Sequence, residues 1–237
     1  MLKLKDLFTL LAAGDLSNVS LGRDSYGEIN ETEYPKVIGA INLGLVELCK
    51  RFRLLENELL LHVTPATSLY YLRDANVVGL VPSPTRYIEL LSGQSSVNII
   101  EVTGVFDSAG NEIIINNRHT TPSIVQAATD TLRFSGLTAA TTYNVVYQAH
   151  PDKIDLNTAY SSETCILPVP DAVIEPLMFY VAHRIYKPGG VNNSAANADK
   201  SAGYQQQYEL SCQKIELLGL GIQNCDSEDT FAAKGWV

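Results

Sequence analysis

The fold of this chain is constrained most strongly by a change in the spacing of its apolar residues. They recur at a helical period from about residue 34 to 52, form short β-like runs from about 58 to 165, and return to the helical period after residue 170. Because neither helical segment has another apolar partner, the two must pack on each other across the intervening segment. This order predicts an α+β fold, in which N- and C-terminal helices form a helical bundle with an inserted, sandwich-like antiparallel β-domain.

The same transitions predict the domain boundaries. Residues 1–57 and 166–222 should form the helical bundle domain, and residues 58–165 the inserted β-domain. Residues 223–237 follow neither period and are predicted to be an extended C-terminal tail. A chain of 237 residues can bury roughly 70% of its unfolded surface, so the core needs no metal or disulfide to be stable.

The clearest helix of the sequence starts at Tyr34. Thr32 is a candidate N-cap, and Asn42 and Gly44 interrupt the face opposite the apolar one. A glycine inside a helix costs about 1 kcal/mol relative to alanine, so Gly44 indicates the close approach of a neighbouring helix or subunit. The residues expected on the buried face are Val37, Ile41, Leu45, Leu48 and Phe52.

Two further helices are predicted after the β-segment. The first starts near Pro170, and the second covers about residues 197–218. His183, in the first of them, is expected to be a partly buried polar residue near a subunit or domain surface. The core positions expected in the first helix are Leu177, Val181 and Ile185. The apolar stripe expected on the second comprises Ala198, Ala202, Tyr208, Cys212 and Ile215.

Within the β-segment, one hairpin stands out. Val97–Phe106 and Glu112–Asn116 have strand-like composition, and they flank Asp107–Asn111, which is rich in residues that tolerate positive φ. This pattern predicts two antiparallel strands joined by a short turn.

Two later runs alternate as strands do. Leu132 and Phe134 lie on one side of the first, and residues 143–147 alternate in the second. The stretch 137–147 resembles the tyrosine-corner strand of fibronectin type III and other immunoglobulin-like modules. That similarity leaves a second class of function open, a β-sandwich module that binds a receptor or a carbohydrate.

The composition argues against several chemistries. The net charge is −9 and no run of Lys or Arg is long enough to grip phosphates, which disfavours sequence-independent binding to nucleic acid. No two of the four histidines have i, i+4 spacing, none of the four cysteines is in a Cys-x-x-Cys pair, and no nucleotide-binding motif is present. We therefore predict no enzyme activity, no metal and no cofactor.

A few carboxylates gather in a predicted loop. Asp152, Asp155 and Glu163 would form a glycosidase pair only if two of them met in space, and we read them as solvated acids. No stretch approaches the roughly 20 apolar residues of a membrane span, which predicts a soluble protein made in the cytoplasm.

Several fragments together resemble the head-to-tail adaptor, or connector, proteins of podophages. These are Gly27–Asn30 ahead of Tyr34–Ile38, the long helix with Asn42 and Gly44, the helix from Glu175–Pro176–Leu177 to Arg184, and Lys200–Ser201–Ala202 with Tyr204 and Tyr208–Glu209 in the last helix. The resemblance covers most of the chain, and helical packing positions carry it.

This resemblance implies a structural protein of the virion, assembled in the host cytoplasm as a ring of twelve copies beneath the portal. The ring would link the capsid to the tail and let DNA pass through without sequence-specific binding, and its β-domains would meet the tail nozzle, tube or fibre proteins. The tail would dock on the portal protein, with Phe231, Lys234, Trp236 and Val237 as the contacting residues. Within phage biology, a tail-tube or neck protein is the alternative.

Overall fold

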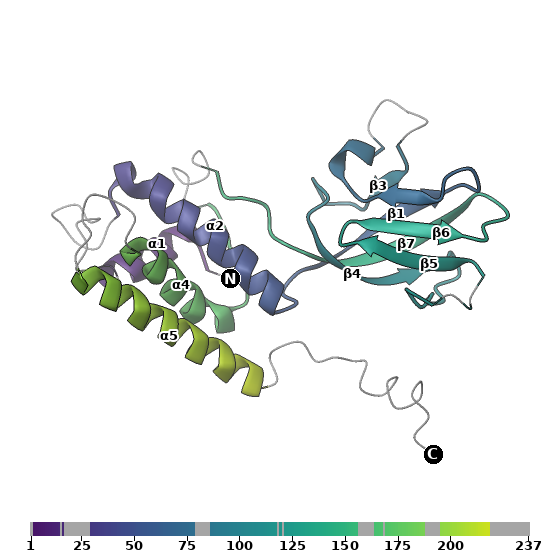
Figure 1. Cartoon of the computed structure of the whole chain (residues 1–237). Coiled ribbons are helices and arrows are strands. Elements are labelled where there is room, and N and C mark those ends of the chain that lie inside the picture. Colours follow the sequence, from purple (N-terminus) through teal and green to yellow (C-terminus); the bar gives the residue numbers. More distant parts are fainter. Residues whose placement is uncertain are drawn as a thin grey trace, which may run out of the picture. The chain divides into compact units, whose positions relative to one another are not determined.

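The computed structural model describes residues 2–14, 16, 29–78, 86–117, 119, 121–155, 164–167, 169–187 and 195–218, without the side chains of 195 and 196. Four helices and two antiparallel sheets, with helices towards both ends and strands between them, confirm the predicted α+β fold (Figure 1). The chain separates into two compact units, Met1–Arg53 with Lys153–Val237, and Leu54–Asp152. We call them the helical unit and the β-unit.

The helical unit contains the four helices that the structure describes. They are α1 (Leu4–Ala13), α2 (Tyr34–Arg51), α4 (Ile174–Tyr186) and α5 (Ala195–Leu217). Helix α4 lies between α2 and α5 and packs on both, and α1 also contacts it (Figure 1). Helix α4 therefore holds together α2 and α5, which are distant in the sequence.

The start of α2 differs from the prediction. A 3-10 turn, Glu31–Glu33, precedes the helix, and the Asn30 side chain accepts a bond of 3.3 Å from the backbone N–H of Thr32. The prediction of Thr32 as the cap was wrong, because the extra turn moves the capping position back to Asn30. A second 3-10 turn, Asp171–Val173, leads into α4 in the same way.

The core of the helical unit draws on all four described helices, including Leu4, Leu7, Phe8 and Leu11 of α1. The side chains there that are predicted core positions and lie buried are Val37, Ile41, Leu45, Leu48, Phe52, Leu177, Val181, Ile185, Tyr208, Cys212 and Ile215. The predicted stripe of α5 was wrong at its first two positions, since Ala198 and Ala202 are exposed. A helix turns by about 100° per residue, which puts Ser201 and Tyr204, rather than those alanines, on the side of Tyr208.

The β-unit is built from two antiparallel sheets. The four-stranded sheet has the order β3-β1-β7-β4, and the three-stranded sheet has the order β2-β6-β5. The strands are β1 (Glu56–Val63), β2 (Leu69–Tyr71), β3 (Ile88–Leu90), β4 (Ile99–Phe106), β5 (Ser123–Ala128), β6 (Thr131–Ser135) and β7 (Thr141–Ala149).

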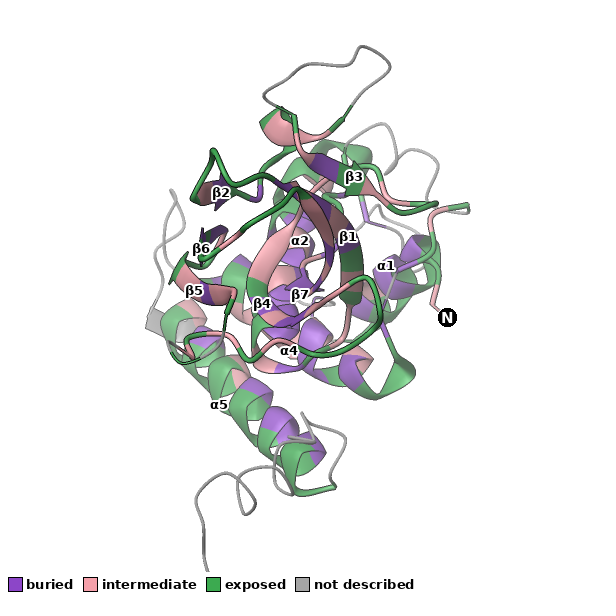
Figure 2. Ribbon diagram, turned by 90° about the vertical axis from the view of Figure 1, so that its right-hand side faces the viewer, coloured by how far each residue is buried: buried purple, intermediate pink, exposed green. Residues whose placement is uncertain are grey.

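A continuous apolar core joins the two sheets. Buried side chains from both sheets form one cluster, and aromatic contacts cross it, with the Phe134 ring 5.5 Å from Tyr70 and 5.2 Å from Tyr143. Along β7, the odd-numbered residues Tyr143, Val145 and Tyr147 are buried, as alternation predicted, and buried and less buried positions alternate along β1 and β7 (Figure 2).

Only the first strand and the turn of the predicted hairpin are present among the described residues. Strand β4 ends at Phe106, and the Asp107 carboxylate closes the turn by accepting bonds from the backbone N–H groups of Ala109 and Asn111. The second predicted strand reduces to one bridge between Phe106 and Glu112. The chain then turns towards the other sheet, where the Asn116 N–H donates to the Ile124 carbonyl at 2.8 Å.

Candidate functional site

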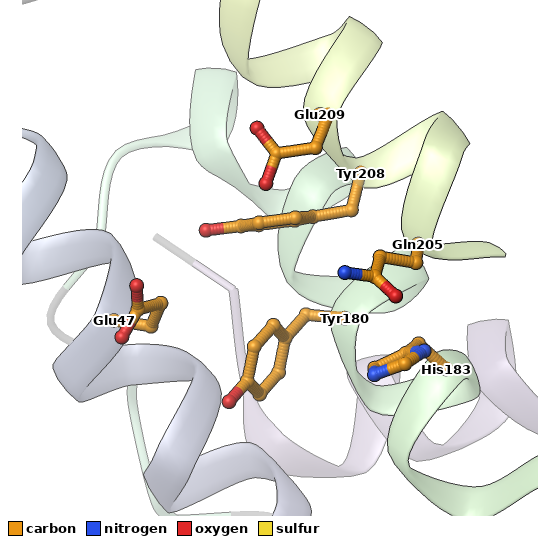
Figure 3. Close-up of a pocket in the computed structure, with 6 residues that line it drawn as sticks. All are labelled: Glu47, Tyr180, His183, Gln205, Tyr208 and Glu209. Carbon is orange, nitrogen blue, oxygen red and sulfur yellow. The ribbon is translucent and has the colours of Figure 1, made fainter. Parts of the chain in front are cut away.

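The helical unit has a pocket of about 300 Å³ formed by α2, α4 and α5 (Figure 3). Its lining residues are Glu47, Tyr180, His183, Gln205, Tyr208 and Glu209. We call it the helix pocket. Glu47, Gln205 and Glu209 are exposed at its rim, beside the buried faces of α2 and α5.

Gly44 sets the distance between α2 and α4 beside this pocket. A Cβ atom placed there would lie 2.7 Å from Leu177 Cδ1 and 3.0 Å from Tyr180 Cδ1. The predicted close approach to a neighbouring helix is thereby confirmed, but the placement of Gly44 opposite the apolar face was wrong, because Gly44 is buried on the face that meets α4. Because no side chain intervenes, the Tyr180 ring can lie against α2 and form one wall of the pocket.

Tyr208 is the most unusual residue of the pocket. It is 5% exposed, yet its buried hydroxyl has no hydrogen-bond partner among the described residues. Arg51 and the Cys212 thiol lie near enough to influence its pKa, but neither completes a hydrogen bond with the hydroxyl. Burial raises the pKa of Tyr208 far above its ordinary value, and the charge of Glu47 adds to the rise. A buried unpaired hydroxyl is costly, so it marks a place where a polar group of a ligand would fit.

Arg51 forms an ion pair with Glu209, one of the two carboxylates of the pocket, and not with Glu47. Its guanidinium donates to Glu209 Oε2 and to Glu216 Oε1, each at 2.7 Å, which ties the end of α2 to α5. It also lies 6.0 Å from the centre of the Tyr208 ring. Glu47, one turn earlier on α2, is exposed and makes no ion pair within the described residues.

His183 is held in one orientation by Ser201. Its Nδ1 lies 3.0 Å from the Ser201 carbonyl oxygen, and the Ser201 hydroxyl donates to the His183 carbonyl at 3.1 Å. Since a carbonyl oxygen only accepts, Nδ1 carries the proton, and Nε2 is the acceptor nitrogen of the neutral ring. The expectation of a partly buried polar histidine is confirmed.

The β-unit has a second hollow, of about 530 Å³, on its four-stranded sheet. Leu60, Phe106 and Val146 give it an apolar floor, and the Asn144 amide donates to Glu58 Oε2 at 3.0 Å. The side-chain oxygen of Asn144, Oδ1, is buried without a hydrogen-bond partner among the described residues. This open sheet face is a second candidate surface for contacts.

The structure describes two of the three loop carboxylates, and they belong to different units. Asp152 belongs to the β-unit and accepts bonds from Ser95, Ser96 and Asn98, whereas Asp155 belongs to the helical unit. Glu163 lies outside the described residues. Asp152 therefore fastens the end of β7 to the loop before β4.

Other predicted features can be placed in the same way. The proposed portal contacts Phe231, Lys234, Trp236 and Val237 lie outside the described residues. Within the described ranges, no three His, Cys, Asp or Glu side chains come together as a metal site would require. No described helix has the length and apolar content to span a membrane.

Sequence reasoning missed the helix pocket itself. His183 was noticed singly, and Tyr208 was assigned to the core, but their convergence with Glu47 depends on the packing angle of three helices. Two acidic residues close to aromatic ones on neighbouring helical faces were the available signal, and many solvated helix surfaces share it.

The fold defines a two-unit α+β protein, a helical unit interrupted by a β-sandwich. The family model of the SU10 adaptor protein matches residues 8–222. The chain belongs to the SU10 adaptor protein family, which confirms the resemblance to phage head-to-tail adaptors. No curated protein matches the chain.

Proposed function

We propose that this protein is the head-to-tail adaptor of a short-tailed bacteriophage, a ring of twelve copies beneath the portal that links the capsid to the tail. The observation that carries the proposal is the family match over residues 8–222, which takes in both the helical unit and the β-unit. Its role is structural, and no catalytic step is assigned to it.

The outer faces of the helices support a ring. Leu43 on α2 and Leu210 and Leu217 on α5 are exposed, although the opposite faces of both helices are buried in the unit. Large apolar side chains on the outer faces of neighbouring helices suit packing against further copies. Twelve chains at −9 each would carry about −108, so the ring would repel the DNA that passes through it.

The test is to purify the protein and image it alone and with the portal of the same phage. Twelve chains of 25.9 kDa give about 311 kDa, which native mass spectrometry resolves from any other copy number. A ring on the portal is the expected result. A monomer that stays monomeric and fails to bind the portal would refute the proposal.

We assign the portal contact to the predicted tail, residues 223–237, on the resemblance and on composition. Phe231 and Trp236 are aromatic residues on an acidic, aperiodic segment, and tryptophan is over-represented among residues that dominate interface energies. Deleting residues 226–237 should leave a folded protein that no longer docks on portal rings. Full portal binding by the truncated chain would refute the assignment, and loss of stability would instead indicate a tail that packs on its own bundle.

We assign contacts with tail or fibre components to the inserted β-domain. The open hollow of the four-stranded sheet, with Leu60 on its floor, supports this assignment. Leu60→Glu in the full chain should weaken attachment of tail components without affecting the portal. Specific binding of a glycan or a receptor by the same face would favour the alternative, a recognition module.

A further inference from the structure

We propose that the helix pocket binds an arginine side chain of a partner protein. The proposal adds a specific recognition site to the adaptor role and rests on it only for the statement that the partner is a protein of the same assembly.

The pocket presents acceptors. The Glu47 carboxylate and the Tyr208 hydroxyl point from α2 and α5 towards the same space (Figure 3). His183 Nε2 lies at the other end as an acceptor, because Nδ1 is bonded to Ser201. A ligand that donates hydrogen bonds can use these acceptors, and beside a carboxylate it gains most if it is a cation.

The walls of the pocket are aromatic. The Tyr180 and Tyr208 rings lie 5.4 Å apart at 66°, so one presents its face where the other presents its edge. Aromatic faces attract cations, and a planar guanidinium stacks on them better than a compact ammonium. The Arg51 guanidinium already lies 6.0 Å from the centre of the Tyr208 ring, which shows that this ring accepts a cation.

The geometry of the acceptors favours arginine over lysine. A guanidinium has five N–H donors in one plane, enough to reach a carboxylate and a hydroxyl together. Arg51 is engaged at the edge of the pocket, since its guanidinium donates to Glu209 and Glu216 at 2.7 Å each. An anion is disfavoured by Glu47 and Glu209 at the rim.

The opening of the pocket fits a donor from outside the unit. Glu47 and Glu209 are exposed at the rim, whereas Tyr208 is buried at the base. A long side chain entering from a partner would pass the carboxylates and pair the Tyr208 hydroxyl. A hydrogen bond to this buried hydroxyl removes the cost of leaving it unpaired, and this gain in free energy arises only when the ligand is bound.

The test titrates the intact protein with N-acetyl-arginine methylamide, followed by the backbone amides of Gln205 and Glu209 and the side-chain amide of Gln205 in NMR spectra. The expected result is a saturable shift confined to the pocket. The citrulline analogue, which has the same shape without the charge, should bind at least about fivefold more weakly, because hydrogen bonds to charged groups are roughly twice as strong as neutral ones. Equal binding of the two analogues, or no shift at these amides, would overturn the proposal.

Two pocket variants and one control complete the design. Glu47→Gln should weaken the arginine analogue about tenfold, since it removes the charge and keeps the shape. Tyr208→Phe should weaken it several-fold while the protein stays at least as stable, because a purely structural tyrosine would lose nothing but an unpaired hydroxyl. Glu175→Gln, at an exposed carboxylate in the first turn of α4, should bind like the unchanged protein. Unchanged binding in Glu47→Gln would refute the pocket assignment.

The small probe separates this proposal from the assembly role. Binding of the arginine analogue does not require a ring, so the analogue can bind even if the protein forms no ring. Equally, the protein can form a ring even if the analogue does not bind. Sedimentation of Glu47→Gln then identifies the source of the arginine. Loss of self-assembly assigns it to a neighbouring copy, and intact self-assembly with weaker portal or tail binding assigns it to another protein. If Glu47→Gln changed none of these interactions, a protein partner would be refuted.

Discussion

Two glycines of α2 give a matched pair of substitutions with different expected effects on stability. Gly39→Ala adds a methyl group that meets nothing within 4 Å, whereas Gly44→Ala adds one 2.7 Å from Leu177 Cδ1 and 3.0 Å from Tyr180 Cδ1. Both gain the same helix propensity, about 1 kcal/mol. The difference between the two variants therefore isolates the packing cost at the α2–α4 contact.

That cost can be bounded from the structure. Leu177 is fully buried, and the Tyr180 ring is confined by the Tyr208 ring 5.4 Å away, so neither neighbour can move aside freely. Overpacking of a filled core costs about 1–3 kcal/mol. Gly39→Ala should thus be more stable than Gly44→Ala by about 1–3 kcal/mol, or roughly 2–12 °C in Tm at about 2–4 °C per kcal/mol.

The assay is urea unfolding followed by circular dichroism at a helical wavelength, with both variants measured beside the unchanged protein. Gly39→Ala should raise the free energy of unfolding, and Gly44→Ala should leave it unchanged or lower it. Equal stabilisation by both substitutions would show that α2 and α4 do not approach each other closely at Gly44. The geometry of the helix pocket, which depends on that contact, would then also be refuted.

Three further predictions follow from burial and hydrogen bonding. Leu48→Ala should lower the free energy of unfolding by about 2–5 kcal/mol. The control is Leu43→Ala on the same helix, which should change it by under about 0.5 kcal/mol because the Leu43 side chain is 48% exposed. Similar losses in the two variants would refute the assigned face of α2. Asn42→Ala should cost about 1–3 kcal/mol by the same assay, because its amide pairs with both the N–H and the carbonyl of residue 154, and a silent substitution would refute that pairing. Burial raises the pKa of the Cys49 thiol to about 11, so at pH 8 iodoacetamide should label Cys165, which is only half-buried, well before Cys49, as peptide mass spectrometry can show. The Cys49 rate should keep rising with pH as the thiolate forms, and early labelling of Cys49 would contradict its burial.

Much of the fold could be predicted because periodicity reports burial directly. The α2 face and the alternation in β7 were legible, since each depends on a single element with one buried side. The errors arose where a neighbouring segment decided the outcome. The 3-10 turn before α2 displaced the cap from Thr32, and the departure of the chain towards Ile124 reduced the strand expected after Asp107–Asn111 to one bridge.

The candidate site could not be predicted for a related reason. Asn42 looked like an interruption of a helix face, but its amide binds the backbone at residue 154, more than a hundred positions away. Tyr208 followed the apolar stripe correctly, yet its unpaired hydroxyl depends on where Glu47 and Arg51 stand relative to it. Such relations arise from tertiary packing, and a one-dimensional pattern does not contain them.

Separate cores in the two units decide how assembly experiments should be interpreted. The buried cluster of the β-unit is composed entirely of residues within Leu54–Asp152, while Leu45 and Leu48 are buried in the helical unit. A core substitution in α2 therefore lowers the stability of the helical unit and leaves the sandwich its own source of stability. If portal binding fails in Leu48→Ala but survives in Leu60→Glu, the helical unit carries that contact, and the opposite pattern would move it to the β-unit. Circular dichroism of each variant at the assay temperature distinguishes a lost surface from a lost fold.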